Sequence, residues 1–460
     1  MNKIHSLSLL FLAALSLSGC SNEEADLFDA SAAERLNQAQ TKYSSFLTSS
    51  RGGWAMEYYA TNDSVGNSES DFKSVGYLLT ARFDTDGSVT MGMNNAFSFN
   101  RYLSDKSLWD IITDEGPVLS FSTYNDCIHS FSNPDDLPSS IRGGGSSVQG
   151  LGAEGDYEFV ITDLQKDAEI AFIKGKKRGT YVRMTRIPEG TDFQKYIADC
   201  DSFRNMVFGA SRTSEPIMTV GSQTYCIQAA SKAETPKIYP YHGDSILTML
   251  RRPFLITHRD GSYYLRFKNA FTLSGDSVVQ EFVYNEANHT FTGVGDGNER
   301  YTIQGQQPLT FFNDKLTSGR TWRFLGSEQN AETFNSTWSA LTTALRKIKY
   351  SLNGNYFNLN MVDGTARLYL TVRTTKGGIV PLYYNFDVDA SNGNLKLTYS
   401  SPADKASTTL LNAVPAIKSL LDAVSDSYAV SSVVSPFDLG TLRLTSASSS
   451  DKWMNLHLIN

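Results

Sequence analysis

Residues 77–93, YLLTARFDTDGSVTMGM, carry the pattern that decides the fold. Apolar side chains recur at every second position on both sides of a turn, first over residues 77–83 and then over residues 89–93. A period of two places these side chains on one face of a strand. The turn Asp84-Thr85-Asp86-Gly87 supplies residue types that tolerate positive φ. The stretch therefore predicts an antiparallel hairpin with one buried face.

The same alternation recurs along most of the chain, so strands should heavily outnumber helices. We expect strands at 117–121, 156–162, 169–174, 180–187, 254–257, 262–267, 278–284, 290–294, 356–361, 366–374, 382–388, 394–399, 441–445 and 453–459.

Four segments instead show helical spacing. The first begins at Ser31, where Glu34 completes the spacing of a capping box, and ends before Gly52. The others cover residues 191–208, 331–348 and 410–424, the last with Pro415 as a kink or false start. The fold class is therefore mainly β with a few helices, built as antiparallel barrel or sandwich domains.

Length and composition fit a folded protein of two domains. The chain has 460 residues, of which 40% are hydrophobic and 19% charged, which excludes wholesale disorder. Its net charge of −7 argues against a nucleic-acid surface. We place the boundary near residue 190, which gives an N-terminal helix plus antiparallel β domain (29–189) and a second β-rich domain with interspersed helices (190–460).

The N-terminus has the layout of an export signal. Lys3 precedes an apolar stretch over residues 7–17, which is too short to span a bilayer, and Ser18-Gly19-Cys20 follow. The ending Leu-Ser-Gly-Cys resembles a bacterial lipobox, in which the cysteine thiol receives a diacylglycerol. We expect a signal peptide at 1–19 and acyl chains such as palmitate on Cys20, with the alternative of a plain secreted protein.

An acidic tether follows, over residues 20–28. Ser21-Asn22-Glu23-Glu24-Ala25-Asp26 resembles the signal that sends Bacteroidetes lipoproteins to the outer face of the outer membrane. The alternative is a charged spacer that leaves the protein in the periplasm. The expected location is the outer membrane, with the body lipid-anchored and facing outside.

Cysteine and histidine usage predicts neither a metal site nor a cofactor. Cys127, Cys200 and Cys226 leave room for one disulfide at most, and no Cys-x-x-Cys spacing occurs. The histidines are scattered singly. The spacing Gly150-Leu151-Gly152-Ala153-Glu154-Gly155 lacks the preceding strand of a dinucleotide site, so a mobile loop at 142–155 explains it better.

Catalytic patterns are equally sparse, and the catalytic residues stay unknown. The sequence has no zinc-protease helix, no Gly-x-Ser-x-Gly elbow and no Walker loop. Ser70 and Lys73 have the spacing of penicillin-recognising enzymes but lie in a polar loop. A pair of carboxylates from distant strands stays open, with Glu57 and Glu158 as the candidates.

Aromatic residues are the remaining indication of a binding function. The chain has 23 Tyr, 26 Phe and 5 Trp, enough for a stacking platform, although strands also use such rings for packing. We expect an exposed ligand-binding cluster first at Trp54, Tyr58, Tyr59 and Trp109.

The N-terminal third resembles a known family. The lipobox, the acidic tether, Gly53-Trp54-Ala55-Met56-Glu57-Tyr58-Tyr59, Phe83-Asp84-Thr85-Asp86-Gly87 and Gly155-Asp156-Tyr157-Glu158-Phe159 are similar to a Bacteroidetes outer-membrane lipoprotein family catalogued only as a domain of unknown function. The resemblance covers roughly the first 190 residues. It implies SusC/SusD-like uptake partners and an accessory, ligand-capturing role, and it carries no catalytic residues with it.

These observations predict a surface lipoprotein that captures a glycan or peptide ligand for a nutrient-uptake system. It would contact the membrane through its lipid anchor and bind no nucleic acid. Two alternatives stay open, a hydrolase that acts on the same polymer and a non-catalytic adhesin or scaffold. A hydrolase requires converging catalytic groups in a cleft, whereas a binder requires an exposed aromatic patch with a polar rim.

Overall fold

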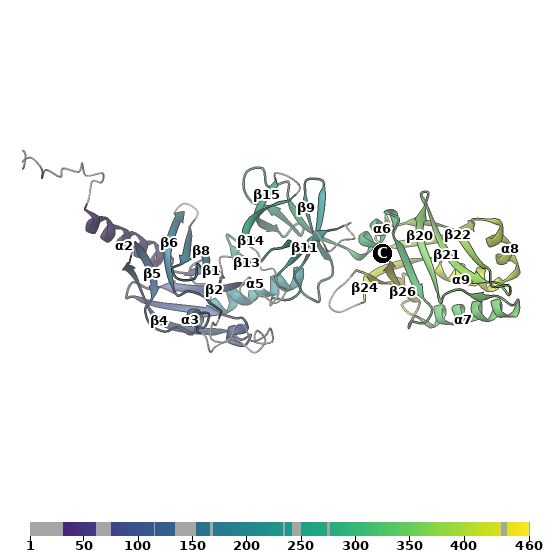
Figure 1. Ribbon diagram of the computed structural model, residues 1–460, viewed down its shortest axis with the longest axis horizontal. Helices are drawn as coiled ribbons and strands as arrows, with labels where there is room; N and C mark the ends of the chain where they lie inside the picture. Colours follow the sequence, from purple (N-terminus) through teal and green to yellow (C-terminus); the bar gives the residue numbers. More distant parts are fainter. Residues whose placement is uncertain are drawn as a thin grey trace, which may run out of the picture.

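A computed structural model shows three antiparallel sheets arranged one after another along the long axis of the molecule (Figure 1). It describes residues 31–60, 75–114, 116–133, 153–165, 169–232, 235–241, 250–273, 277–433 and 439–459. The expected fold class is confirmed, because strands dominate and every strand pairing is antiparallel. The first and third of these sheets close into barrels.

The first sheet is a closed eight-stranded barrel, because β1 pairs with both β2 and β8. The predicted hairpin at 77–93 is confirmed as β2 and β3, with Ala81 opposite Met91. Apolar side chains from alternate positions fill the interior. The barrel strands are β1 (Trp54–Tyr59), β2 (Gly76–Phe83), β3 (Ser88–Met93), β4 (Leu103–Thr113), β5 (Pro117–Phe121), β6 (Glu158–Gln165), β7 (Ile170–Gly175) and β8 (Tyr181–Arg186).

Helix α2 (Ala32–Thr48) leads into this barrel and begins as its sequence predicts. The Ser31 side chain accepts a hydrogen bond from the Glu34 backbone, and the Glu34 side chain accepts one from the Ser31 backbone, which completes the capping box. At the other end, Trp54 Nε1 donates to the Leu47 carbonyl at 2.8 Å. Two short turns, η1 (Ala96–Ser98) and α3 (Asp126–His129), complete the first unit.

The second sheet is open and has nine strands, in the order β12-β11-β10-β9-β17-β16-β15-β14-β13. Helix α5 (Phe193–Phe208) follows the barrel and packs its apolar face on this sheet, with Asp192 as N-cap. Its strands are β9 (Glu215–Val220), β10 (Gln223–Gln228), β11 (Lys237–Pro240), β12 (Leu250–Arg251), β13 (Phe254–Arg259), β14 (Ser262–Leu273), β15 (Ser277–Asn285), β16 (Thr290–Gly293) and β17 (Thr302–Gln306).

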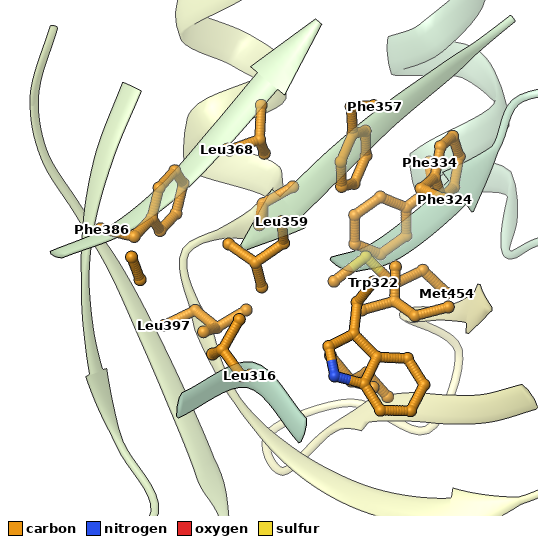
Figure 2. Close-up of a cluster of buried hydrophobic side chains, with 14 of the residues drawn as sticks. Leu316, Trp322, Phe324, Phe334, Phe357, Leu359, Leu368, Phe386, Leu397 and Met454 are labelled. Carbon is orange, nitrogen blue, oxygen red and sulfur yellow. The ribbon is translucent and has the colours of Figure 1, made fainter. Parts of the chain in front are cut away.

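The third sheet closes into a second barrel through the pairing of β21 with β22, and β19 is added at its side. Figure 2 shows rings from neighbouring strands meeting in its core, where the Phe324 and Phe357 centroids lie 4.7 Å apart. The strands are β18 (Thr321–Leu325), β19 (Ser351–Leu352), β20 (Tyr356–Val362), β21 (Thr365–Arg373), β22 (Ile379–Asp389), β23 (Leu395–Pro402), β24 (Asp426–Ser432), β25 (Thr441–Ser446) and β26 (Trp453–Ile459).

Four helices accompany the third sheet. Helix α6 (Pro308–Thr317), which the sequence patterns did not indicate, places Phe312 and Leu316 in the core. Helix α7 (Glu332–Lys347) confirms the predicted helix at 331–348. The single helix expected at 410–424 is two, because Pro415 begins α9 (Pro415–Val424) and α8 (Lys405–Ala413) ends before it. Residues 190–460 thus contain two sheets whose cores meet, because Ile217 and Cys226 of the second sheet belong to the core cluster of the third.

The basic turn between β7 and β8 is held by one buried carboxylate, that of Asp156. Its oxygens accept hydrogen bonds from the backbone of Lys177, Arg178 and Thr180 at 3.0–3.1 Å, and from the Thr180 hydroxyl at 2.9 Å. A Cβ added at Gly175 would overlap this carboxylate, so the turn needs glycine there. The Lys176, Lys177 and Arg178 side chains of the turn are exposed.

We expect Asp156→Ala to lower the free energy of unfolding by about 2 to 4 kcal/mol, because three backbone N–H groups lose their acceptor. Chemical denaturation of the variant measures the loss. Asp110→Ala is the matched control, since Asp110 is exposed on β4 and its loss should change stability by less than about 0.5 kcal/mol. Equal effects of the two substitutions would refute the role of Asp156.

Candidate ligand-binding site

Strand β1 is buried on both of its faces, which a strand on a free barrel would not be. Trp54, Met56 and Tyr58 point into the barrel core, whereas Ala55 belongs to the core of the second unit. Glu57, on the same outer face as Ala55, is fully buried. The central sheet therefore covers the outside of the barrel at β1, and we call this contact between the barrel and the central sheet the seam.

Five charged side chains form connected ion pairs at the seam, and we call them the charged cluster: Glu57 (β1), Arg183 (β8), Arg259 (β13), Arg266 (β14) and Glu281 (β15). Strand pairing sets Glu57 directly opposite Arg183, whose Nη1 donates to Glu57 Oε1 at 2.7 Å. Arg266 Nη1 reaches the other oxygen, Oε2, at 3.2 Å. One carboxylate thus joins the barrel to the central sheet.

Glu281 makes the second link across the seam. Its Oε1 accepts a hydrogen bond from Arg259 at 2.9 Å and lies 3.2 Å from Arg183 Nη1. Burial raises the pKa of Glu281, but the neighbouring guanidinium groups outweigh it, so the net pKa lies below the ordinary value of 4.5. Burial likewise opposes the charge on Arg266, yet the Glu57 carboxylate and Tyr181 raise its pKa. Glu281 and Arg266 therefore both stay ionised at neutral pH.

A cavity of about 370 Å³ lies beside the charged cluster. Its walls come from both sides of the seam, from β6, β7 and β8 of the barrel and from β14, β15 and the turn after β16. The volume is within the range that binds small ligands. The cavity is lined by Gln165, Ile170, Phe172, Arg183, Arg266, Ala270, Gln280, Glu281, Val294 and Asn298.

The structure corrects the expectation that Trp54, Tyr58, Tyr59 and Trp109 form an exposed cluster, because all four are buried. Trp54 and Tyr58 face the barrel interior, where the Tyr58 hydroxyl accepts a hydrogen bond from the Asp156 backbone at 3.2 Å. Trp109 packs against Phe83 with ring centroids 5.0 Å apart. Tyr59 faces the seam, where Lys268 Nζ lies 5.7 Å from its ring centroid.

The two candidate carboxylates do not converge. Glu57 lies on β1 and Glu158 on β6, with β7 and β8 between them in the barrel order. Glu57 is occupied by two arginines, and Glu158 accepts a hydrogen bond from the Ser120 hydroxyl at 3.4 Å. A glycosidase pair needs carboxyl groups within about 5 to 9.5 Å across a substrate, so this pair does not suit that reaction.

The cysteines and histidines take other positions. Cys127, Cys200 and Cys226 are free and buried. Cys20, the expected lipid attachment, lies outside the described residues, as do Ser70, Lys73 and most of the loop expected at 142–155. Among the described residues no group of three His, Cys, Asp or Glu side chains could hold a metal ion. Of the helices that the structure describes, none is long and apolar enough to cross a bilayer.

The sequence patterns missed the arginines of the charged cluster and the aromatic rings that are exposed. Arg183 and Arg266 lie on strands whose sequences alternate like any other strand. The one sequence signal that distinguished them was a charged residue within a strand that was expected to be buried. On the barrel surface, the His129 ring lies between Tyr124 and Tyr157, with centroids 5.0 Å and 4.5 Å away. These two tyrosines are 54% and 41% exposed.

The charged cluster makes stability depend on pH. Because the folded-state pKa of Glu281 is lowered, its contribution is present above pH 4.5 and lost as pH falls through the folded pKa. We expect Glu281→Gln to lower the free energy of unfolding by about 2 kcal/mol at pH 7, and the difference from wild type to shrink in acid. Denaturant titrations across pH measure this.

Glu286→Gln provides the matched control, because Glu286 is exposed just beyond β15. It should change the free energy of unfolding by less than about 0.5 kcal/mol at every pH. A destabilisation by Glu281→Gln that is the same in acid and at neutral pH would mean that packing, not ion pairing, stabilises the seam.

Comparisons with known proteins bear on the family alone. No curated protein matches the chain. A DNA polymerase sliding clamp from Pseudomonas aeruginosa is 9% identical, with 92% of this chain and 98% of that chain covered and a TM-score of 0.12. A transferrin-binding protein B mutant from Haemophilus parasuis is 8% identical, with 88% and 74% covered and a TM-score of 0.13. Likenesses this distant carry no argument.

A family described as a domain of unknown function (DUF4302) matches residues 24–286, which is more than half of the chain. The match runs from before α2 to the end of β15, so it contains the barrel and every member of the charged cluster. The protein therefore belongs to this family of unknown function.

Proposed function

We propose that this protein is a lipid-anchored outer-membrane protein that captures a glycan or peptide ligand outside the cell. In this role it would serve as an accessory to a SusC/SusD-like uptake system. Support for the location comes from the sequence alone, in the lipobox ending at Cys20 and the acidic tether after it. Support for ligand capture comes from the seam.

The cavity at the seam is the single observation that carries the ligand-binding proposal. Large side chains such as Trp54, Tyr58 and Phe83 lie in the interior of the first barrel. At the seam, a cavity of about 370 Å³ is bounded by apolar side chains, side-chain amides, two guanidinium groups and the Glu281 carboxylate. Polar groups that converge beside apolar side chains are what a small-ligand site uses to orient its ligand.

We expect the protein lacking residues 1–20 to bind members of a glycan and peptide array without converting them. Product analysis of every hit separates a binder from a hydrolase, which would release fragments. Asp110→Ala should bind as wild type does, because Asp110 is exposed on β4 and does not line the cavity. Silence across the whole array would contradict ligand capture and favour a scaffold.

We expect native protein isolated from membranes to begin at an acylated Cys20, as mass spectrometry of its N-terminal peptide can show. Cys20→Ala should abolish labelling by radioactive palmitate and leave the folded body unchanged. Ser21→Ala is the control and should leave labelling intact. A native N-terminus without fatty chains would contradict the anchor while leaving the cavity argument untouched.

A further inference from the structure

The cavity presents hydrogen-bond donors that the protein does not use. Arg183 bonds through Nη1 alone, to Glu57, and lies close to Glu281 through the same atom. Its Nε and Nη2 atoms have no acceptor among the described residues, and neither is sealed off inside the protein. The Arg183 side chain is 3% exposed and lines the cavity, so this small exposure leaves part of the guanidinium open to a ligand.

The charged cluster also carries an excess of positive charge. Within the part of the chain that the structure describes, Arg183, Arg259 and Arg266 form ion pairs with two carboxylates, those of Glu57 and Glu281. One guanidinium charge is therefore left without a carboxylate of its own in a site largely removed from water. Charge pairs are stronger there than in bulk water, so the cluster favours a ligand with a single negative charge.

The same cavity is also lined by hydrogen-bond acceptors that the protein does not use. The side-chain amides of Gln165, Gln280 and Asn298 donate to the protein through their nitrogens. No donor from the described part of the chain reaches their carbonyl oxygens. Three carbonyl oxygens beside the apolar side chains of Phe172 and Ile170 suit a ligand that has several hydroxyl donors and an apolar face.

We propose that the cavity binds the carboxylate-bearing residue of an acidic sugar. Arg183 would receive the carboxylate, since a planar guanidinium matches its geometry, and the amide oxygens would accept sugar hydroxyls. A uronic acid carries the single charge and the hydroxyls that this lining matches, whereas an acidic peptide side chain lacks the hydroxyls. This inference rests on the proposed function and names the ligand class for its site.

The test titrates the protein lacking residues 1–20 with glucuronate and with glucose, which differ only in the carboxylate, by isothermal calorimetry. Glucuronate should bind at least about tenfold more tightly than glucose, and more weakly as salt is raised. Equal affinities would overturn the proposal. Acetylated aspartate is the third ligand, and its binding as tightly as glucuronate would overturn the assignment to a sugar.

A pair of variants isolates charge without disturbing the charged cluster. Ala270 lines the cavity and is exposed, so its replacement removes no hydrogen bond. Ala270→Asp adds a negative charge, and Ala270→Asn adds a side chain of the same size without charge. Glucuronate affinity should fall by about tenfold in the Asp variant relative to the Asn variant. Equal affinity in the two variants would overturn the proposal.

Different results would contradict ligand capture and the acidic-sugar site. If array ligands bind but neutral and acidic sugars bind alike, and Ala270→Asp changes nothing, ligand capture stands and the acidic-sugar site falls. If neither the array ligands nor glucuronate bind, both fall. Binding of glucuronate that is lost in Ala270→Asp and kept in Ala270→Asn supports both.

Discussion

The ion pairs of Glu57 are the constraint on which the first two units of this structure depend. Its carboxylate is fully buried, and its partners, Arg183 and Arg266, belong to the barrel and to the central sheet. A buried charge without partners costs several kcal/mol of folding free energy. If the barrel separated from the central sheet, the Glu57 carboxylate would lose its partner Arg266. The two sheets should therefore fold and persist as one body, and the family match over residues 24–286 covers this same body.

The same constraint gives the cavity its chemistry. Guanidinium groups that are held in place by buried carboxylates present their remaining donors at fixed positions, which lowers the entropy cost of binding an anion. The C-terminal barrel contributes no residue to the charged cluster, and its core cluster includes Ile217 and Cys226 of the central sheet. It is attached to the central sheet through α6, where Lys315 Nζ donates to the Tyr241 carbonyl at 2.9 Å. The charged cluster at the seam therefore lies within residues 24–286, the part of the chain that the family covers.

Local patterns predicted the elements well and the site poorly, for physical reasons. The hairpin at β2 and β3 and the capping box at Ser31 depend on neighbours a few residues apart, so spacing reveals them. Whether alternating strands close into a barrel or stack as a sandwich depends on pairings such as β1 with β8, which no local period encodes. The prediction of an exposed aromatic cluster was wrong. Tyr59, for example, points outward from the barrel but is covered by the second sheet. Glu57 finds its partners 126 and 209 residues away, beyond any motif.

Native-state hydrogen exchange tests most directly whether the charged cluster unites the first two sheets. Amide protons of β1 and β8 should exchange through an opening that has the same free energy, and the same denaturant dependence, as that of β14 and β15. The reason is that neither sheet can unfold by itself without breaking the ion pairs that both share. Strands β20 and β21 of the C-terminal barrel serve as the internal comparison. Exchange of β14 and β15 at a lower free energy, while β1 and β8 stay protected, would contradict the account.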